Sequence, residues 1–192
     1  MGNYDGVHLG HQRMIGVLKA RAAQLRCAAT VLVFEPSSKE FIDPDGAPPR
    51  LTRWREKFLA LAAQGVERLV TLRFDERMRA MTPRSFVDHL IVERLGTRLI
   101  VVGDDFRYGS NAGGTIEGLR AAGEAHGFKV EQMAPFVFDG VRVSSTAVRE
   151  RLESADYRGA ARLLGRPYRM MGRVVHGRQL GRTLGFPTAN LR

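Results

Sequence analysis

Continuous apolar runs alternate with amphipathic helical patterns from residue 11 to residue 165, and few architectures satisfy that alternation. The runs 30–34 (TVLVF) and 99–102 (LIVV) are apolar enough to be strands buried on both faces. Each follows a helical pattern, at 11–26 and at 83–95. Alternating helices and strands predict an α/β fold with a parallel sheet.

Capping residues and short strands complete this pattern. We expect Thr52 and Thr82 to begin helices, because threonine side chains accept hydrogen bonds from free helix N–H groups. Asp156 is expected to cap a last helix that ends at Gly165. After Pro167 the residues alternate in polarity, which indicates an antiparallel strand. The chain therefore divides into a domain at 1–165 and the start of another at 166–192, with further strands expected at 67–74, 128–133 and 141–143.

The basic residues are unevenly distributed. The net charge is +10, and residues 149–192 contain ten arginines but three acidic residues. These arginines are spread over helix-like and strand-like patterns instead of one compact cluster, which favours solvated side chains or sites for small anions over a nucleic-acid surface. We expect neither a nucleic acid nor a membrane as partner, while the oligomeric state is left open.

The chain also lacks the features of secreted and membrane proteins. No run approaches the roughly 18–20 apolar residues of a membrane span, and no signal peptide is evident, so a cytoplasmic protein is expected. One cysteine, Cys27, excludes an intramolecular disulfide framework and a multi-cysteine zinc site. We expect its side chain to be a small buried hydrophobe.

The segment GNYDGVHLGH, residues 2–11, carries the strongest local signal. His8 and His11 are three residues apart at the start of a helix, so both rings lie on one face. Free N–H groups at a helix N-terminus attract phosphate, and imidazoles can donate hydrogen bonds to its oxygens. Gly10 permits close approach of a nucleotide to the backbone. A surface turn with two incidental histidines is the alternative.

Two further segments have the composition of ligand sites. Ser144, Ser145 and Thr146 begin a helix, with Arg149 one turn along, an arrangement that suits phosphate but also occurs in ordinary helix caps. The glycine-rich loop 103–114 follows a predicted strand, where open α/β sheets bind ligands. A loop anchored by a buried phenylalanine is its alternative interpretation.

The chain also contains FEP at 34–36, GDDFRYG at 103–109 and PTAN at 187–190. Taken together and in this order, the segments resemble those of the bacterial bifunctional FAD synthetases. That family joins an FMN adenylyltransferase module, a Rossmann-like nucleotidyltransferase with a parallel sheet, to a β-barrel riboflavin kinase module. The resemblance implies transfer of AMP from ATP to FMN, giving FAD and pyrophosphate, with Mg²⁺ required. ATP, FMN and riboflavin are the small-molecule partners it implies.

The resemblance also implies roles for individual residues. His8 and His11 would stabilise charge on the ATP phosphates, and Arg149 would hold the departing phosphates. Asp105, Phe106 and Arg107 would help to place the flavin and the nucleotide. In the kinase module, Thr188 and Asn190 would bind Mg²⁺ and ATP phosphates. The remaining phosphate-site residues it implies are Gly2, Asn3, Asp5, Gly10, Ser144, Ser145 and Thr146.

The sequence departs from the family pattern at several places. The chain begins at the first motif, so we expect the first strand to be missing, and it stops after PTAN, so an incomplete barrel and no riboflavin kinase activity are expected. Ser37 stands where the family often has histidine. Three alternatives stay open: an inactive flavin- or nucleotide-binding fragment, a nucleotidyltransferase with another phosphate-bearing acceptor, and a basic nucleic-acid binder.

Overall fold

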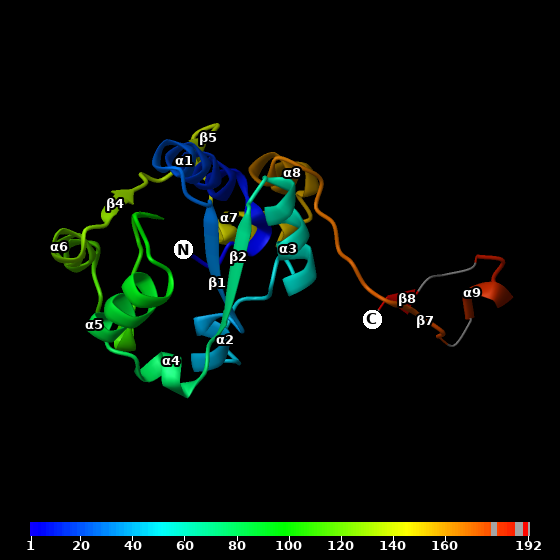
Figure 1. Cartoon of the computed structure of the whole chain (residues 1–192). Coiled ribbons are helices and arrows are strands. Elements are labelled where there is room, and N and C mark those ends of the chain that lie inside the picture. The colour runs from blue at the N-terminus through cyan, green and yellow to red at the C-terminus, as the bar shows by residue number, and fades with distance from the viewer. Residues whose placement is uncertain (178–179, 187–189, 192) are drawn as a thin grey trace.

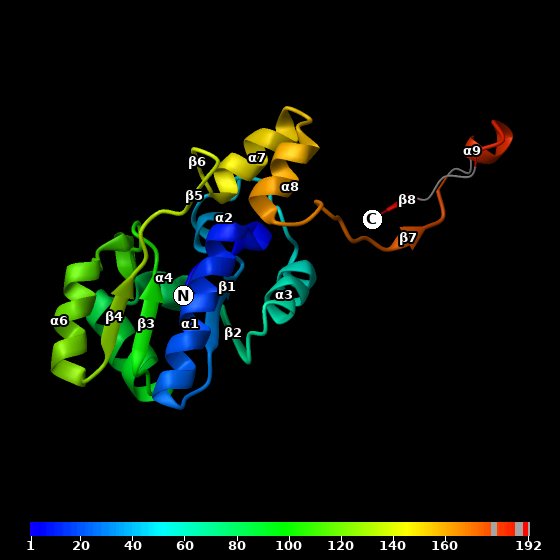
Figure 2. The ribbon, with the colours of Figure 1, turned by 90° about the horizontal axis from the view of Figure 1, so that it is seen from above.

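Two pairs of parallel strands form the centre of the α/β region (Figures 1 and 2). In the computed structural model, which describes residues 1–177, 180–186 and 190–191, β1 (Thr30–Glu35) pairs with β2 (Arg68–Arg73). β3 (Leu99–Val102) pairs in parallel with β4 (Lys129–Gln132). The predicted α/β class is therefore confirmed, although the expected single sheet is two separate pairs among the described strands.

The first two residues lie between the strand pairs. The Gly2 N–H donates to the Leu32 carbonyl of β1 at 3.2 Å, and the Met1 amino group donates to the Val101 carbonyl of β3 at 3.4 Å. An apolar hollow of about 380 Å³ separates the pairs and is bounded by Leu18, Leu32 and Ile100 among other side chains. Because no described strand occupies this position, β1 and β3 do not hydrogen bond to each other.

Helices cover the strands on both sides (Figure 2). α1 (Leu9–Leu25) runs along β3, while η2 (Phe86–Arg94) and α6 (Ile116–His126) pack against the β3–β4 side. The helix predicted after Thr82 is present, but it changes from the short α5 (Pro83–Ser85) to a π-helix at η2. The remaining elements are η1 (Asp5–Val7), α2 (Ser38–Ile42), α3 (Trp54–Ala63), α4 (Glu76–Ala80), η3 (Ser110–Ala112), β5 (Val137–Phe138), β6 (Val141–Arg142), α7 (Ser145–Glu153), α8 (Tyr157–Leu164), β7 (Val174–Val175), α9 (Leu180–Thr183) and β8 (Asn190–Leu191). None of the helices in the described ranges is long and apolar enough to cross a membrane.

Two expectations about single residues are wrong. Cys27 is exposed, because it follows the left-handed residue Arg26 that ends α1 and so lies beyond the apolar face of that helix. Thr52 does not cap α3; Arg53 occupies the cap position, and the Thr52 hydroxyl is buried against Asp5.

The C-terminal residues extend away from the α/β region (Figure 1). The predicted antiparallel strand is present as the two-residue β7, paired with β8. One hydrogen bond, from the Met171 N–H to a Glu56 carboxylate oxygen at 2.5 Å, joins this segment to α3.

Two helical glycines provide a matched test of the packing between α6 and β4. A Cβ atom at Gly123 would lie 2.4 Å from the Phe128 carbonyl oxygen, whereas a Cβ at Gly16 in α1 would meet nothing within 4 Å. We expect Gly123→Ala to lower the free energy of unfolding by about 1–3 kcal/mol, since backbone atoms must shift. Gly16→Ala should raise it by about 0.5–1 kcal/mol through helix propensity alone. Urea unfolding measures both, and equal effects would contradict the packing described.

Candidate active site

Three residues just before α1 have a left-handed backbone. The φ angles are 49° at Tyr4, 79° at Gly6 and 42° at Val7. For a β-branched residue such as Val7 this conformation is a strained outlier. Strain of this kind persists where surrounding contacts hold it, and it concentrates at functional sites. Here it brings His8 to the first turn of α1.

The two histidines stack on each other, as their spacing predicts. Their ring centroids are 3.6 Å apart with an angle of 16° between the planes. His8 is the N-cap of α1, and its Nδ1 accepts a hydrogen bond from the His11 N–H at 3.3 Å. Gly10 lies beneath this pair, since a Cβ there would be 3.2 Å from the His8 ring. A larger side chain at residue 10 would displace the His8 ring.

Both imidazoles are neutral near pH 7. Burial lowers the pKa of His8 to about 4, although the Asp5 carboxylate opposes that shift. Burial also lowers the pKa of His11 well below its ordinary value, and the charges of His8 and Lys57 add to the effect. Because Nδ1 of neutral His8 is an acceptor, its Nε2 carries the proton and can donate to a ligand. The His11 Nδ1 is buried and has no hydrogen-bond partner among the residues that the structure describes.

Acid should destabilise the protein through these rings. The pKa of His8 is about 4 when folded and 6.5 when unfolded, so the unfolded chain binds more protons between these values. The stability that the neutral His8 ring gives the folded protein is fully present above pH 6.5 and is lost as the pH falls toward 4. We expect wild type to lose about 2–3 kcal/mol of unfolding free energy through His8 between pH 7.5 and 4.5. His8→Asn should show a shallower decline in urea titrations, and an equal decline would contradict this prediction.

A buried carboxylate connects this motif to the next two segments. The Asp5 oxygens accept hydrogen bonds from the Leu51 N–H, the Thr52 N–H and the Thr52 hydroxyl at 3.0–3.1 Å. The Arg149 guanidinium of α7 donates to Asp5 Oδ2 at 2.6 Å. Arg149, predicted as a phosphate ligand, is thus paired within the protein. It also donates to the Pro49 carbonyl at 2.7 Å.

The N-terminus of α7 lies against the same motif. Ser144 caps the helix by accepting from the Ala147 N–H at 3.1 Å, and the Ser145 hydroxyl donates to the Asp5 carbonyl at 2.9 Å. Thr146 is exposed at the same helix end. The two predicted phosphate-binding helix N-termini, of α1 and α7, therefore lie on either side of Asp5.

Sequence reasoning missed several residues that hold the motif in place. The Arg166 guanidinium donates to the carbonyls of Gly6 at 2.7 Å and Val7 at 3.0 Å. The Gln12 amide donates to the Val7 carbonyl at 2.9 Å. Lys57 of α3 lies beside the exposed Asn3, its Nζ 3.5 Å from the carboxamide oxygen. No local pattern marks Arg166 and Lys57, because both act across a long sequence separation.

The remaining predicted residues are less connected to the histidines. Asp105 and Arg107 are exposed, and Phe106 stacks on Tyr108 with centroids 5.8 Å apart. No hydrogen bond or ring contact within the described ranges joins these three residues to His8 or His11. Asn190 is exposed at the start of β8, and Thr188 lies outside the described residues. In the described part of the chain, no group of three His, Cys, Asp or Glu side chains could hold a metal ion.

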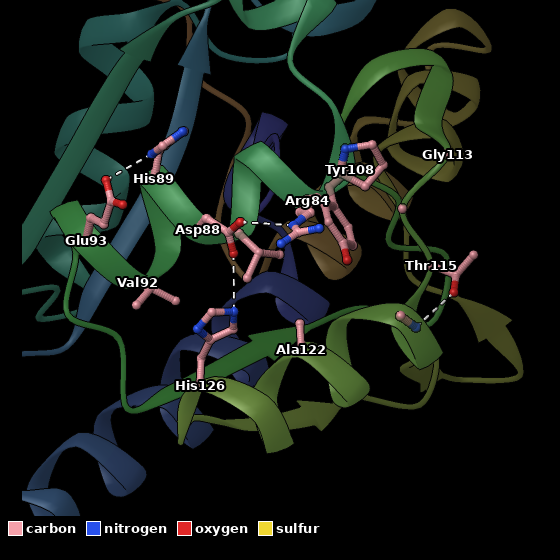
Figure 3. Close-up of a pocket in the computed structure, with 14 residues that line it drawn as sticks. Arg84, Asp88, His89, Val92, Glu93, Tyr108, Gly113, Thr115, Ala122 and His126 are labelled. Atoms are coloured by element: carbon pink, nitrogen blue, oxygen red, sulfur yellow. Dashed lines mark hydrogen bonds and ion pairs between the residues drawn. The ribbon is translucent and has the colours of Figure 1, made fainter.

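A larger hollow, of about 690 Å³, lies elsewhere, between η2 and α6 (Figure 3). Its charged side chains are paired with one another: Asp88 with His126 at 3.2 Å and with Arg84 at 3.5 Å, and His89 with Glu93 at 2.9 Å. The predicted ligand loop 103–114 contributes Tyr108, Gly113 and Gly114 to its wall. Among the described residues that line it there is no histidine of the motif and no predicted phosphate-site residue. The histidine motif is therefore the stronger candidate site, since it combines buried, neutral donors with two helix N-termini.

Two family models match this chain. Residues 1–147 match the family model described as FAD synthetase, and residues 164–192 match the model described as riboflavin kinase. The first match includes the histidine motif and the start of α7, and the second begins close to the domain boundary expected near residue 165.

Individual relatives extend over the whole chain. The sequence is 45% identical over 192 residues to a bifunctional riboflavin kinase/FMN adenylyltransferase of Pseudomonas fluorescens, and 44% identical over 191 residues to that of Escherichia coli K12. It covers 61% of the length of each. A crystal structure described as a macrolide-efflux protein from Streptococcus pneumoniae superposes with a TM-score of 0.83 at 30% identity, covering 100% of this chain and 62% of that one.

Proposed function

The chain belongs to the FAD synthetase family, and on that premise we propose that it transfers AMP from ATP to FMN, giving FAD and pyrophosphate. The bifunctional relatives carry this activity in their names, and this chain spans about three fifths of their length. The observation that supports the proposal most directly is the stacked pair His8 and His11 at the N-terminus of α1, beside the N-terminus of α7.

In the proposed reaction an oxygen of the FMN phosphate attacks the α-phosphorus of ATP in line. A bond forms between that oxygen and the α-phosphorus, and the bond from the α-phosphorus to the bridging oxygen of the β-phosphate breaks. Pyrophosphate carries away the electron pair, so no covalent enzyme intermediate is needed. The protein contributes position and hydrogen-bond donors toward the oxygens that gain charge.

The residues present suit these tasks. The Nε2–H of neutral His8 donates to a phosphate oxygen without the cost of removing a charged imidazolium from water. Ser144, Ser145 and Thr146 surround free N–H groups of α7, which favour the departing phosphates. Arg149 would have to share its guanidinium between Asp5 and those phosphates, since it has five N–H donors.

We also propose the finer features that the family resemblance implies. These are a Rossmann-like nucleotidyltransferase domain at 1–165, the first strands of a β-barrel kinase module at 166–192, and a cytoplasmic protein. Magnesium is expected to accompany ATP. The Asp5 oxygens are engaged by backbone, hydroxyl and guanidinium donors, so we do not assign Asp5 as a magnesium ligand. Thr188 and Asn190 stay the magnesium ligands that the resemblance implies for the kinase module.

FAD formation from FMN, ATP and Mg²⁺ by the purified chain, resolved by chromatography, tests the proposal. FAD that appears with FMN, and not when FMN is replaced by another phosphate-bearing acceptor, is the expected result. A folded chain, as judged by circular dichroism, that forms no FAD would contradict the proposed activity. That result would favour a fragment that only binds ligands.

A further inference from the structure

In the described part of the chain, no carboxylate lies within ion-pair distance of the Lys57 Nζ. Lys57 is 4% exposed. Its Nζ donates to the neutral Asn3 carboxamide oxygen at 3.5 Å, which is the upper limit for a hydrogen bond. A buried ammonium without a counter-ion is costly, because it has left water without gaining an opposite charge. Burial accordingly lowers the pKa of the Lys57 ammonium, although the nearby carboxylates of Asp5, Glu35 and Glu40 oppose the shift.

Lys57 lines a polar hollow beside the histidine motif. The hollow has about 20 Å³ of free volume, which is room for one water-sized group. Asn3 and Ser37 contribute neutral polar groups to its wall, and Lys39 contributes a second lysine. The Asp5 and Glu40 carboxylates also line it, and each is paired with an arginine. Asn3 is exposed, so the hollow can be reached from solvent. Its proximity to the histidines is reflected in the effect of the Lys57 charge on His11.

The other guanidinium groups around the hollow are already neutralised. Arg50 pairs with Glu40 and, at 2.6 Å, with Glu35. Arg149 pairs with Asp5 at 2.6 Å. Lys57 is thus a buried cation whose donors are free to meet an anion, and two uncharged hydrogen-bonding side chains lie around it.

We propose that Lys57 binds a phosphate oxygen of a substrate in this hollow, close to the neutral histidines. This inference rests on the proposed function, because ATP and FMN are the phosphate-bearing substrates of the proposed reaction. An ammonium ion is a compact charge with three donors, which suits a phosphate oxygen at the bottom of a narrow hollow. Lys57 would supply the positive charge that His8 and His11 lack near pH 7.

Ligand pairs that differ in phosphate alone test this role. Affinities of wild type and Lys57→Met for FMN and riboflavin, and for ATP and adenosine, are measured by calorimetry. We expect Lys57→Met to weaken FMN or ATP binding at least about tenfold and to leave the phosphate-free member of that pair unchanged. A loss for FMN assigns the oxygen to the acceptor, and a loss for ATP assigns it to the nucleotide. Equal affinity of both proteins for all ligands overturns the proposal, as does a wild-type chain that binds neither FMN nor ATP.

Two further variants keep the test decisive. Lys129→Met removes the same charge from an exposed position in β4 and should change no affinity. Asn3→Asp keeps Lys57 but places a carboxylate beside its Nζ, so it should also weaken phosphate binding, and this variant decides the matter if Lys57→Met does not fold. The two proposals can fail separately. If wild type makes no FAD but Lys57→Met still weakens phosphate binding, the proposed reaction is contradicted and the Lys57 site is supported.

Discussion

FAD formation should fall by about a hundredfold or more when His8 is replaced by alanine. The His8 Nε2–H is a fixed donor, because Nδ1 is held by the His11 N–H at 3.3 Å and the ring stacks on His11. Removing one preorganised donor to an oxygen that gains charge costs roughly 10²–10³ in kcat. His11→Ala should cause a loss of similar size, since it removes the stacking partner as well as an imidazole. Steady-state rates of FAD formation, measured chromatographically, give both values.

The controls separate catalysis from folding. His8→Asn offers an oxygen that can still cap α1, so it should keep the stability of the helix start while lowering kcat at least about tenfold. His89→Ala removes an exposed histidine paired with Glu93 and should leave the rate within about twofold of wild type. If folded His8→Ala made FAD at the wild-type rate, the histidine pair would have no part in the reaction.

The strands and principal helices could be predicted because their signals are local. Runs 31–34 and 99–102 are apolar at every position, and β1 and β3 form there as expected. The short helices α2 and α4 were not predicted, since each spans five residues and has no buried side chain to produce a periodic pattern. The sheet separates into two pairs because no described strand lies between β1 and β3.

The same distinction applies to the site. His8 and His11 are three residues apart, so their stacking could be expected from helical geometry. Asp5 and Arg149 meet although they are 144 positions apart, and the buried position of Lys57 depends on how α3 packs against η1. Sequence reasoning therefore identified the candidate residues of the motifs but not the interactions between them. The ion pair between Arg149 and Asp5 is one of those it missed.

The largest loss of stability should come from Asp5→Ala. Asp5 is 4% exposed and accepts from two backbone N–H groups, a hydroxyl and a guanidinium. The substitution leaves these donors unmatched and the Arg149 charge, whose side chain is 13% exposed, without its partner. Breaking a buried pair in this way costs about 3–5 kcal/mol, a large share of the 5–15 kcal/mol of a typical domain. Urea unfolding at pH 7.5 measures the change.

Two comparison variants identify the cause of that loss. Asp104→Ala removes an exposed pair with Arg142 at 3.1 Å and should cost no more than about 1 kcal/mol. In the double variant Asp5→Ala with Arg149→Met, the unpaired guanidinium is gone, so part of the stability should return. The remainder would reflect the backbone donors of Leu51 and Thr52, which still lack an acceptor. Strictly additive losses in the double variant would mean that the two side chains do not interact, contrary to their 2.6 Å separation.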